Sequence, residues 1–199
     1  MTEWFAEFVD RMCEPLAEAQ LDISRIPYSD EDLKRLRALS AFDKAGAHST
    51  MASRGSLRPI PYLVSAALHD KSTDARCSAL HALRVLGDSR LVPVFLECLG
   101  HPSSSDKWYA MAAISQHAGP EAWEVVFKRT RQILSKDRRT EQGPRSELIE
   151  ALDYLFRFRD QSESIQLLLG QITTKYAHRL SAIERDWLSS RNDSAVGAG

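Results

Sequence analysis

Residues 59–120 contain an internal repeat with a period of 32 residues. When this part of the sequence is moved along itself by 32 positions, Pro61 falls on Pro93 and Gly87 falls on Gly119. Each unit reads as an outer helix of about ten residues, a polar turn, and an inner helix of about fourteen residues that ends at glycine. A period of roughly 30 to 40 residues made of helix pairs is typical of repeat proteins, whose neighbouring pairs cover each other's apolar surface. The sequence therefore predicts an all-α fold.

The polar turns and the continuation of the repeat are also predicted. The turns KSTD and PSSSD end with Asp74 and Asp106, which we expect to cap the inner helices. A third, less regular copy contains the helices PEAWEVVFKRTRQIL and SELIEALDYLFRF. The second helix of this copy aligns with that of the first copy when the sequence is moved by 72 positions, which is two repeats of 32 residues plus eight. We therefore expect eight inserted residues in the turn SKDRRTEQGP. One or two further helices within residues 164–188 are expected to close the array.

Two helices are expected before the repeats. The first covers residues 2–21 and is kinked or split by Pro15. The second is capped by Ser29 and ends near Gly46. Its buried face is predicted from apolar residues at helical spacing, namely Leu33, Leu36, Leu39 and Phe42. The small polar segment that follows, AHSTMASRGS, is predicted to be a loop.

These segments define the expected domain organisation. We expect one domain over residues 1–190, which is enough chain to bury a substantial core. It consists of an N-terminal helical cap (1–45), a loop (46–58) and the repeats (59–190). Residues 191–199 have no apolar periodicity and are expected to form a disordered tail.

The best repeat, DARCSALHALRVLGDSRLVPVFLECL, resembles the HEAT-like repeats first noted in phycobilisome lyases. The positions that match are Asp74, Arg76, Ala79, Leu80, Ala82, Leu83, Gly87, Asp88, Leu91, Pro93 and Leu96. The resemblance covers residues 60–120, although Trp108 replaces the arginine and Pro120 the aspartate of the second copy. It implies a short right-handed α-solenoid. The helices expected before residue 59 would form an irregular N-terminal helical cap on this solenoid. The resemblance also implies that Asp74, Arg76 and Asp88 are structural residues at the corners.

Composition limits the function classes. The 26 Lys and Arg residues are balanced by 27 Asp and Glu residues, so the chain is not a polycation built for nucleic acid. The three cysteines fit buried thiols in a reducing cytosol, and the helical pair Cys77 and His81 lacks the further ligands that a metal site needs. The longest apolar stretches are too short to span a membrane, and the N-terminus is unlike a signal peptide. We expect a cytoplasmic protein without metal or cofactor.

HEAT-like families include protein-binding scaffolds, chromophore lyases and alkylpurine DNA glycosylases, and the fold does not choose among them. Trp108, Tyr109 and Trp123, with Asp106, fit the glycosylase alternative, since such an enzyme needs aromatic faces and a carboxylate. Aromatic residues on apolar helix faces are more often core residues. No run of Lys and Arg recurs on successive inner helices, which argues against nucleic acid as partner. A lyase-like chaperone for a chromophore is the remaining alternative.

We expect a non-catalytic protein-binding module, either an adaptor or an immunity-type inhibitor that blocks a toxin domain. In a HEAT-like stack, polar positions on second helices would line the concave side. Six partner-binding residues are predicted on these helices. Moving the sequence by 32 positions places Gln116 on Arg84, and moving it by 72 places Asp153 on His81, so these four residues form a row. His117 is next to Gln116, and Arg157 lies one turn after Asp153. The row carries both charge signs, which suits a protein surface better than a phosphate backbone. Residues 128–145 carry seven basic and two acidic side chains, and Arg138 and Arg139 there are predicted to lie at the edge of the site.

Overall fold

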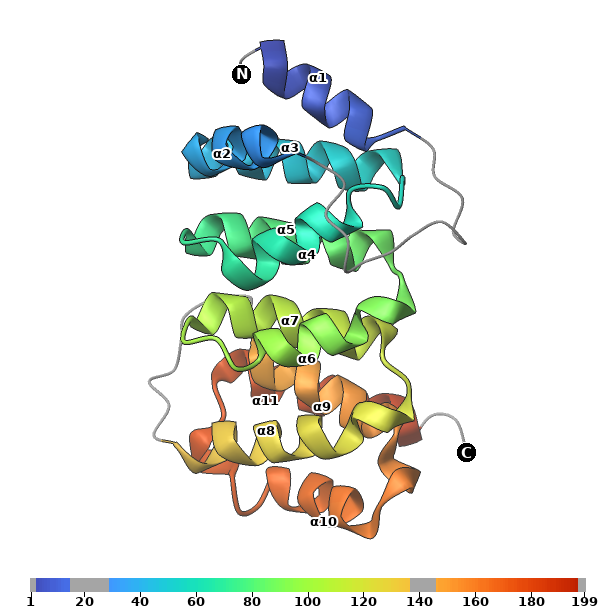
Figure 1. Cartoon of the computed structure of the whole chain (residues 1–199). Coiled ribbons are helices and arrows are strands. Elements are labelled where there is room, and N and C mark those ends of the chain that lie inside the picture. The colour runs from blue at the N-terminus through green and yellow to red at the C-terminus, as the bar shows by residue number, and fades with distance from the viewer. Residues whose placement is uncertain (1–2, 15–28, 137–145, 197–199) are drawn as a thin grey trace. The chain divides into compact units, whose positions relative to one another are not determined.

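The computed structural model describes residues 3–14, 29–136 and 146–196 (Figure 1). Within these ranges the regular secondary structure is helical and contains no strand, which confirms the all-α prediction. The α-helices are α1 (Glu3–Met12), α2 (Asp30–Ala38), α3 (Ala41–Arg54), α4 (Ile60–His69), α5 (Thr73–Leu86), α6 (Val92–Cys98), α7 (Ser104–His117), α8 (Trp123–Ser135), α9 (Glu147–Arg157), α10 (Glu163–Ile172) and α11 (Ala182–Val196). Short 3-10 turns occur at Ser89–Leu91, Pro120–Ala122, Arg159–Gln161 and Ala177–Arg179. No helix in the described ranges is long and apolar enough to cross a membrane.

The chain divides into two compact units, Met1–Ala113 and Ile114–Gly199, and the boundary falls within α7. The single domain expected over residues 1–190 stays a prediction.

The first unit is built from helix pairs. α4 packs against α5, α3 packs against α5, and α6 packs against α4 (Figure 1). α1 covers part of α3. Fully buried apolar side chains fill the space between these helices, including Met51, Leu63, Leu80, Leu83 and Phe95. Each helix alone would leave its apolar side in water, so burial between neighbours stabilises the arrangement.

The predicted repeat is confirmed in its helix boundaries. Helices α4 and α5 occupy 60–69 and 73–86, and a shift of 32 brings their starts onto or within one residue of the starts of α6 and α7. Gly87 ends α5 with a φ of 70°, in the left-handed region that glycine adopts without strain. Gly119 is not an equivalent stop, because α7 already ends at His117 and Gly119 has extended backbone angles. Pro120 explains the difference, since a proline pushes the residue before it out of the helical region.

The predicted aspartate caps are wrong. Ser72 caps α5, and its hydroxyl accepts a hydrogen bond from the Ala75 amide. The Ser103 hydroxyl accepts one from the Asp106 amide at the start of α7. Asp74 is instead exposed in the first turn of α5, where its charge suits the helix dipole. Asp106 turns inward and forms a buried ion pair.

The N-terminal prediction needs three corrections. α1 ends at Met12, and the rest of the expected helix over residues 2–21 lies largely outside the described residues. The second expected helix is two helices, because Ser40 caps a new helix, α3, and resets the helical phase. Phe42, which was expected on the buried face, is therefore 87% exposed.

The loop predicted over residues 46–58 is wrong for its first part. α3 continues to Arg54 and ends at Gly55, whose φ is 67°. Its inward face consists of Ala47, His48, Met51 and Ala52, and these residues recur at helical spacing. Small and polar composition therefore concealed an amphipathic helix.

The second unit has α9 at its centre. α8, α10 and α11 each pack against α9. The two helices predicted for the third repeat correspond to α8 and α9. Of the one or two closing helices that were expected, the structure contains two, α10 and α11. The disordered tail predicted for residues 191–199 is wrong for 191–196, since α11 continues to Val196 and Arg191 forms an ion pair with Asp153 on α9. Residues 197–199 lie outside the described range.

Candidate functional site

The candidate binding surface in the first unit lies on α5 and α7, and we call it the α5–α7 surface. His81 and Arg84 come from α5, and Trp108 and Tyr109 come from α7. The His81 and Tyr109 rings pack edge to face, with 6.1 Å between their centroids. The Trp108 and Tyr109 rings pack in the same way, with 4.7 Å between their centroids. The Arg84 guanidinium lies 3.4 Å from Nδ1 of His81. The surface thus combines a cation, an imidazole and two aromatic rings.

The packing of α5 explains why these side chains face outward. Ala79, Leu80, Ala82 and Leu83 are fully buried and define the inward face of the helix. His81 lies on the opposite face and is exposed, Arg84 is half-buried, and the adjacent Val85 is 53% exposed. Trp108 and Tyr109 are half-buried. The two aromatic side chains therefore contribute to packing and to the surface at the same time.

Four other predicted residues lie in the second unit. Asp153 on α9 accepts a hydrogen bond from the Ser115 hydroxyl at 3.2 Å. Arg157, one turn further along α9, donates to the carbonyl of Ala118 at 3.3 Å and lies over the Phe158 ring at 4.7 Å. Both residues therefore contact the last part of α7 and the residue after it.

Gln116 and His117 belong to the same end of α7. Gln116 is exposed and His117 is half-buried. The structure brings the predicted residues together in two groups, His81 with Arg84 and the other four around the end of α7. Trp123, the third aromatic residue of the glycosylase alternative, is half-buried at the start of α8 and meets the Phe127 ring at 6.2 Å. Arg138 and Arg139 lie outside the described residues.

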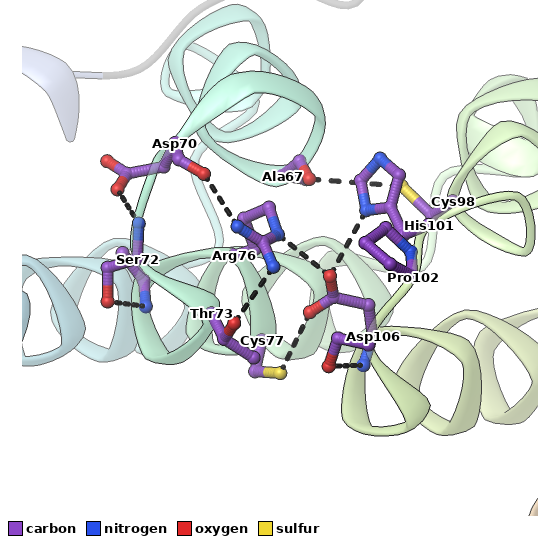
Figure 2. Close-up of polar contacts among 12 residues, drawn as sticks. Ala67, Asp70, Ser72, Thr73, Arg76, Cys77, Cys98, His101, Pro102 and Asp106 are labelled. Carbon is purple, nitrogen blue, oxygen red and sulfur yellow. Dashed lines mark hydrogen bonds and ion pairs between the residues drawn. The ribbon is translucent and has the colours of Figure 1, made fainter.

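A buried polar cluster joins α5 to the start of α7 (Figure 2). The Arg76 guanidinium donates from Nε to Asp106 at 2.7 Å, and Asp106 is fully buried. Arg76 also donates to the Asp70 carbonyl at 2.8 Å and to the Thr73 hydroxyl at 2.9 Å. His101 lies 3.2 Å from the Asp106 carboxylate. Arg76 thus has the structural role that the resemblance implied, and Asp106 has no access to a ligand in solvent.

The turn after α5 is stabilised by the interactions of Asp88 with Arg90. Asp88 accepts a hydrogen bond from the Arg90 amide at 2.9 Å and pairs with the Arg90 guanidinium at 2.6 Å. This confirms the structural role expected for Asp88.

Two of the three cysteines of the first unit, Cys77 and Cys98, are buried and weakly reactive, whereas Cys13 is half-buried. Burial raises the pKa of Cys77 to about 12, and its hydrogen bond to the Asp106 carboxylate at 3.3 Å acts in the same direction. Burial also raises the pKa of Cys98 to about 12. Both thiols are protonated at neutral pH, which makes them weak nucleophiles and weak metal ligands. In the described ranges, no group of three or more His, Cys, Asp and Glu side chains could hold a metal ion.

A second buried polar cluster was not foreseen. His48 on α3 is fully buried, with Nδ1 2.7 Å from the Ser78 hydroxyl and Nε2 3.0 Å from the Tyr62 hydroxyl. Burial lowers the pKa of His48 to about 4, so its ring is neutral at pH 7. Beside it, Lys44 and Asp70 form an ion pair at 2.6 Å with both side chains largely buried. The helical spacing of Lys44, Ala47, His48 and Met51 is the signal that could have placed these side chains inside.

The basic segment predicted over residues 128–145 is only partly described. Arg129 is neutralised, since its guanidinium makes two hydrogen bonds to the Glu147 carboxylate, at 2.6 and 2.9 Å. Lys128 and Arg131 are exposed on α8, and Lys136 is exposed directly after it. These three cations are the described part of the positive charge that the sequence places here.

No protein-family model matches the chain, and no curated protein is significantly similar to it. The function is therefore inferred from the chemistry of the surfaces.

Proposed function

We propose that this chain is a non-catalytic protein-binding module of the cytoplasm, acting as an adaptor or as an immunity-type inhibitor of a toxin domain. In this proposal the helix pairs form a short right-handed HEAT-like α-solenoid. The second helices of the pairs line its concave side, and the partner docks there and on the basic segment after α8.

The observation that carries the proposal is the composition of the α5–α7 surface. Arginine and aromatic side chains contribute most strongly to protein–protein interfaces, because they bury a large area and keep a polar end for hydrogen bonds. Here Arg84, Trp108 and Tyr109 lie beside the exposed side chains of His81 and Val85. Because these residues belong to packed helices, little side-chain and backbone entropy would be lost on binding.

The charge pattern supports a protein rather than a nucleic acid as partner. Gln116 and Arg157 add a neutral and a positive group to the proposed site, and Asp153 adds a carboxylate that Arg191 pairs with. A phosphate backbone would instead favour positive charge alone. The glycosylase alternative also needs an accessible carboxylate, and Asp106 is buried against Arg76.

Affinity capture from the native host, followed by mass spectrometry, tests the proposal. The baits are the wild-type chain, Arg84→Glu, and the control Lys71→Glu, which reverses an exposed charge in the turn between α4 and α5. We expect a partner that wild type and Lys71→Glu recover equally and that Arg84→Glu recovers at least tenfold less, because a reversed charge in an interface is both unpaired and repelled.

The kinetics of the purified pair separate the two parts of the site. Reversing Arg138 and Arg139 to Glu should slow association and weaken its salt dependence, whereas replacing Arg84 and Arg157 should mainly speed dissociation. Equal recovery by all baits, or tight binding of the purified chain to DNA, would contradict the proposal.

A further inference from the structure

A cationic stripe runs along the exposed face of α8 in the second unit. Lys128, Arg131, Gln132 and Ser135 are spaced by three or four residues, so they lie along one side of the helix, and all are exposed. Lys136 extends the positive charge beyond the end of the helix. We call these residues the α8 stripe.

The charge of the α8 stripe is not neutralised by the residues that the structure describes. Lys128 and Lys136 have no ion pair there, and the Arg131 guanidinium lies 5.9 Å above the Phe127 ring. Arg129 provides the contrast, because Glu147 pairs with it and removes it from the stripe. Unpaired cations on one helix face raise the local potential and attract negative charge.

A shallow hollow of about 360 Å³, widely open to solvent, lies within the α8 stripe and is lined by Phe127, Lys128, Arg131, Gln132 and Ser135. The half-buried Phe127 ring supplies an apolar wall. Around it, Lys128 and Arg131 supply cations, and the Gln132 amide can donate hydrogen bonds. The stripe therefore offers an apolar contact surrounded by groups that bind carboxylates.

We propose that the α8 stripe docks an acidic segment of a partner protein that carries one apolar side chain among its carboxylates. Charge complementarity selects the acidic segment, and the Phe127 wall of the hollow selects the apolar side chain. A nucleic acid would satisfy the cations with phosphates but has no aliphatic side chain for the hollow. The inference rests on the proposed protein-binding function and names the chemistry of the partner.

Peptide binding to the full chain, measured by fluorescence anisotropy at low salt, tests the inference. The probe is a labelled peptide of about twelve Glu, Asp and Ser residues with one central Leu, and its match has Ala instead. Lys128→Glu should weaken binding of the Leu peptide about fivefold to tenfold, since it removes an attraction and adds a repulsion. The control Lys175→Glu reverses another exposed lysine of the second unit and should change binding less than twofold. The Ala peptide should bind about fivefold more weakly, because less apolar surface enters the hollow.

Three results would overturn the inference. They are no binding of the Leu peptide at about 1 mM, equal weakening by Lys128→Glu and Lys175→Glu, and tighter binding of a DNA duplex that Lys128→Glu abolishes. If a captured partner depends on Arg84 while these peptides fail, the inference falls and the proposed function stands. If all baits recover their partners equally, or the purified chain binds DNA tightly, the proposed function falls, and the inference that rests on it falls with it.

Discussion

His48 should make the stability of this protein sensitive to mild acid. The imidazole is fully buried between Ser78 and Tyr62, and burial lowers its pKa from 6.5 to about 4. In the unfolded chain the ring is exposed and titrates near its ordinary value. Between these two pKa values the unfolded state binds a proton that the folded state does not, so the free energy of unfolding falls as the pH falls.

The size of the effect follows from the two pKa values of His48. A difference of one in pKa between the folded and unfolded states corresponds to about 1.4 kcal/mol of unfolding free energy. The full loss of unfolding free energy, from above pH 7 to below pH 4, is therefore on the order of 3 kcal/mol. Between pH 7 and pH 5 the expected loss is about 2 kcal/mol. The pKa values of Asp32, Asp70 and Asp88 are lowered from 3.8, so these carboxylates stay ionised over this window and add little to the change.

Urea unfolding at pH 7 and pH 5, followed by far-UV circular dichroism, measures this loss. His48→Gln supplies a neutral amide that can hydrogen-bond and cannot titrate. It should be less stable than wild type at pH 7 and should lose about 2 kcal/mol less than wild type between pH 7 and pH 5. If wild type and His48→Gln lost the same stability over this window, His48 would not be the buried neutral group described here.

Three further predictions concern stability, each measured by urea unfolding at pH 7. Leu83→Ala should cost about 2 to 4 kcal/mol, because Leu83 is fully buried; a loss below half a kcal/mol would refute that packing. Asp106→Ala should cost about 3 to 5 kcal/mol, since it leaves the largely buried charge of Arg76 without its partner, and a loss below about 1 kcal/mol would contradict this. Gly170→Ala should stabilise by about 0.5 to 1 kcal/mol, because the added Cβ meets no atom within 4 Å on helix α10, whereas Gly87→Ala should destabilise because its φ is 70°. The same sign for both glycine variants would refute the assigned backbone angles.

The sequence predicted the repeated helix pairs well because their signals are local. Apolar spacing defines α4 to α6 and α8 to α11, and Gly87 ends α5 as expected. The N-terminal part was misread where the signal is tertiary. α3 buries Ala47 and His48, whose size and polarity look like those of loop residues until the helices that cover them are known.

The candidate surface could be predicted only as a set of outward positions. Helical phase separates His81 and Arg84 from the buried Leu80 and Leu83. It does not reveal that Tyr109, from the next inner helix, lies against His81. Nor does it reveal that Arg129 is neutralised by Glu147, because that pair joins residues 18 positions apart.

The bridge from Arg76 also bears on how the first unit opens. One guanidinium holds the Asp70 carbonyl in the turn before α5, the Thr73 hydroxyl and the Asp106 carboxylate at the start of α7. A fluctuation that frees the start of either helix must break the hydrogen bonds of Arg76 and leave a buried charge without its partner. The two helix starts should therefore behave as one cooperative unit in hydrogen exchange, with backbone amides of both segments protected to a similar free energy.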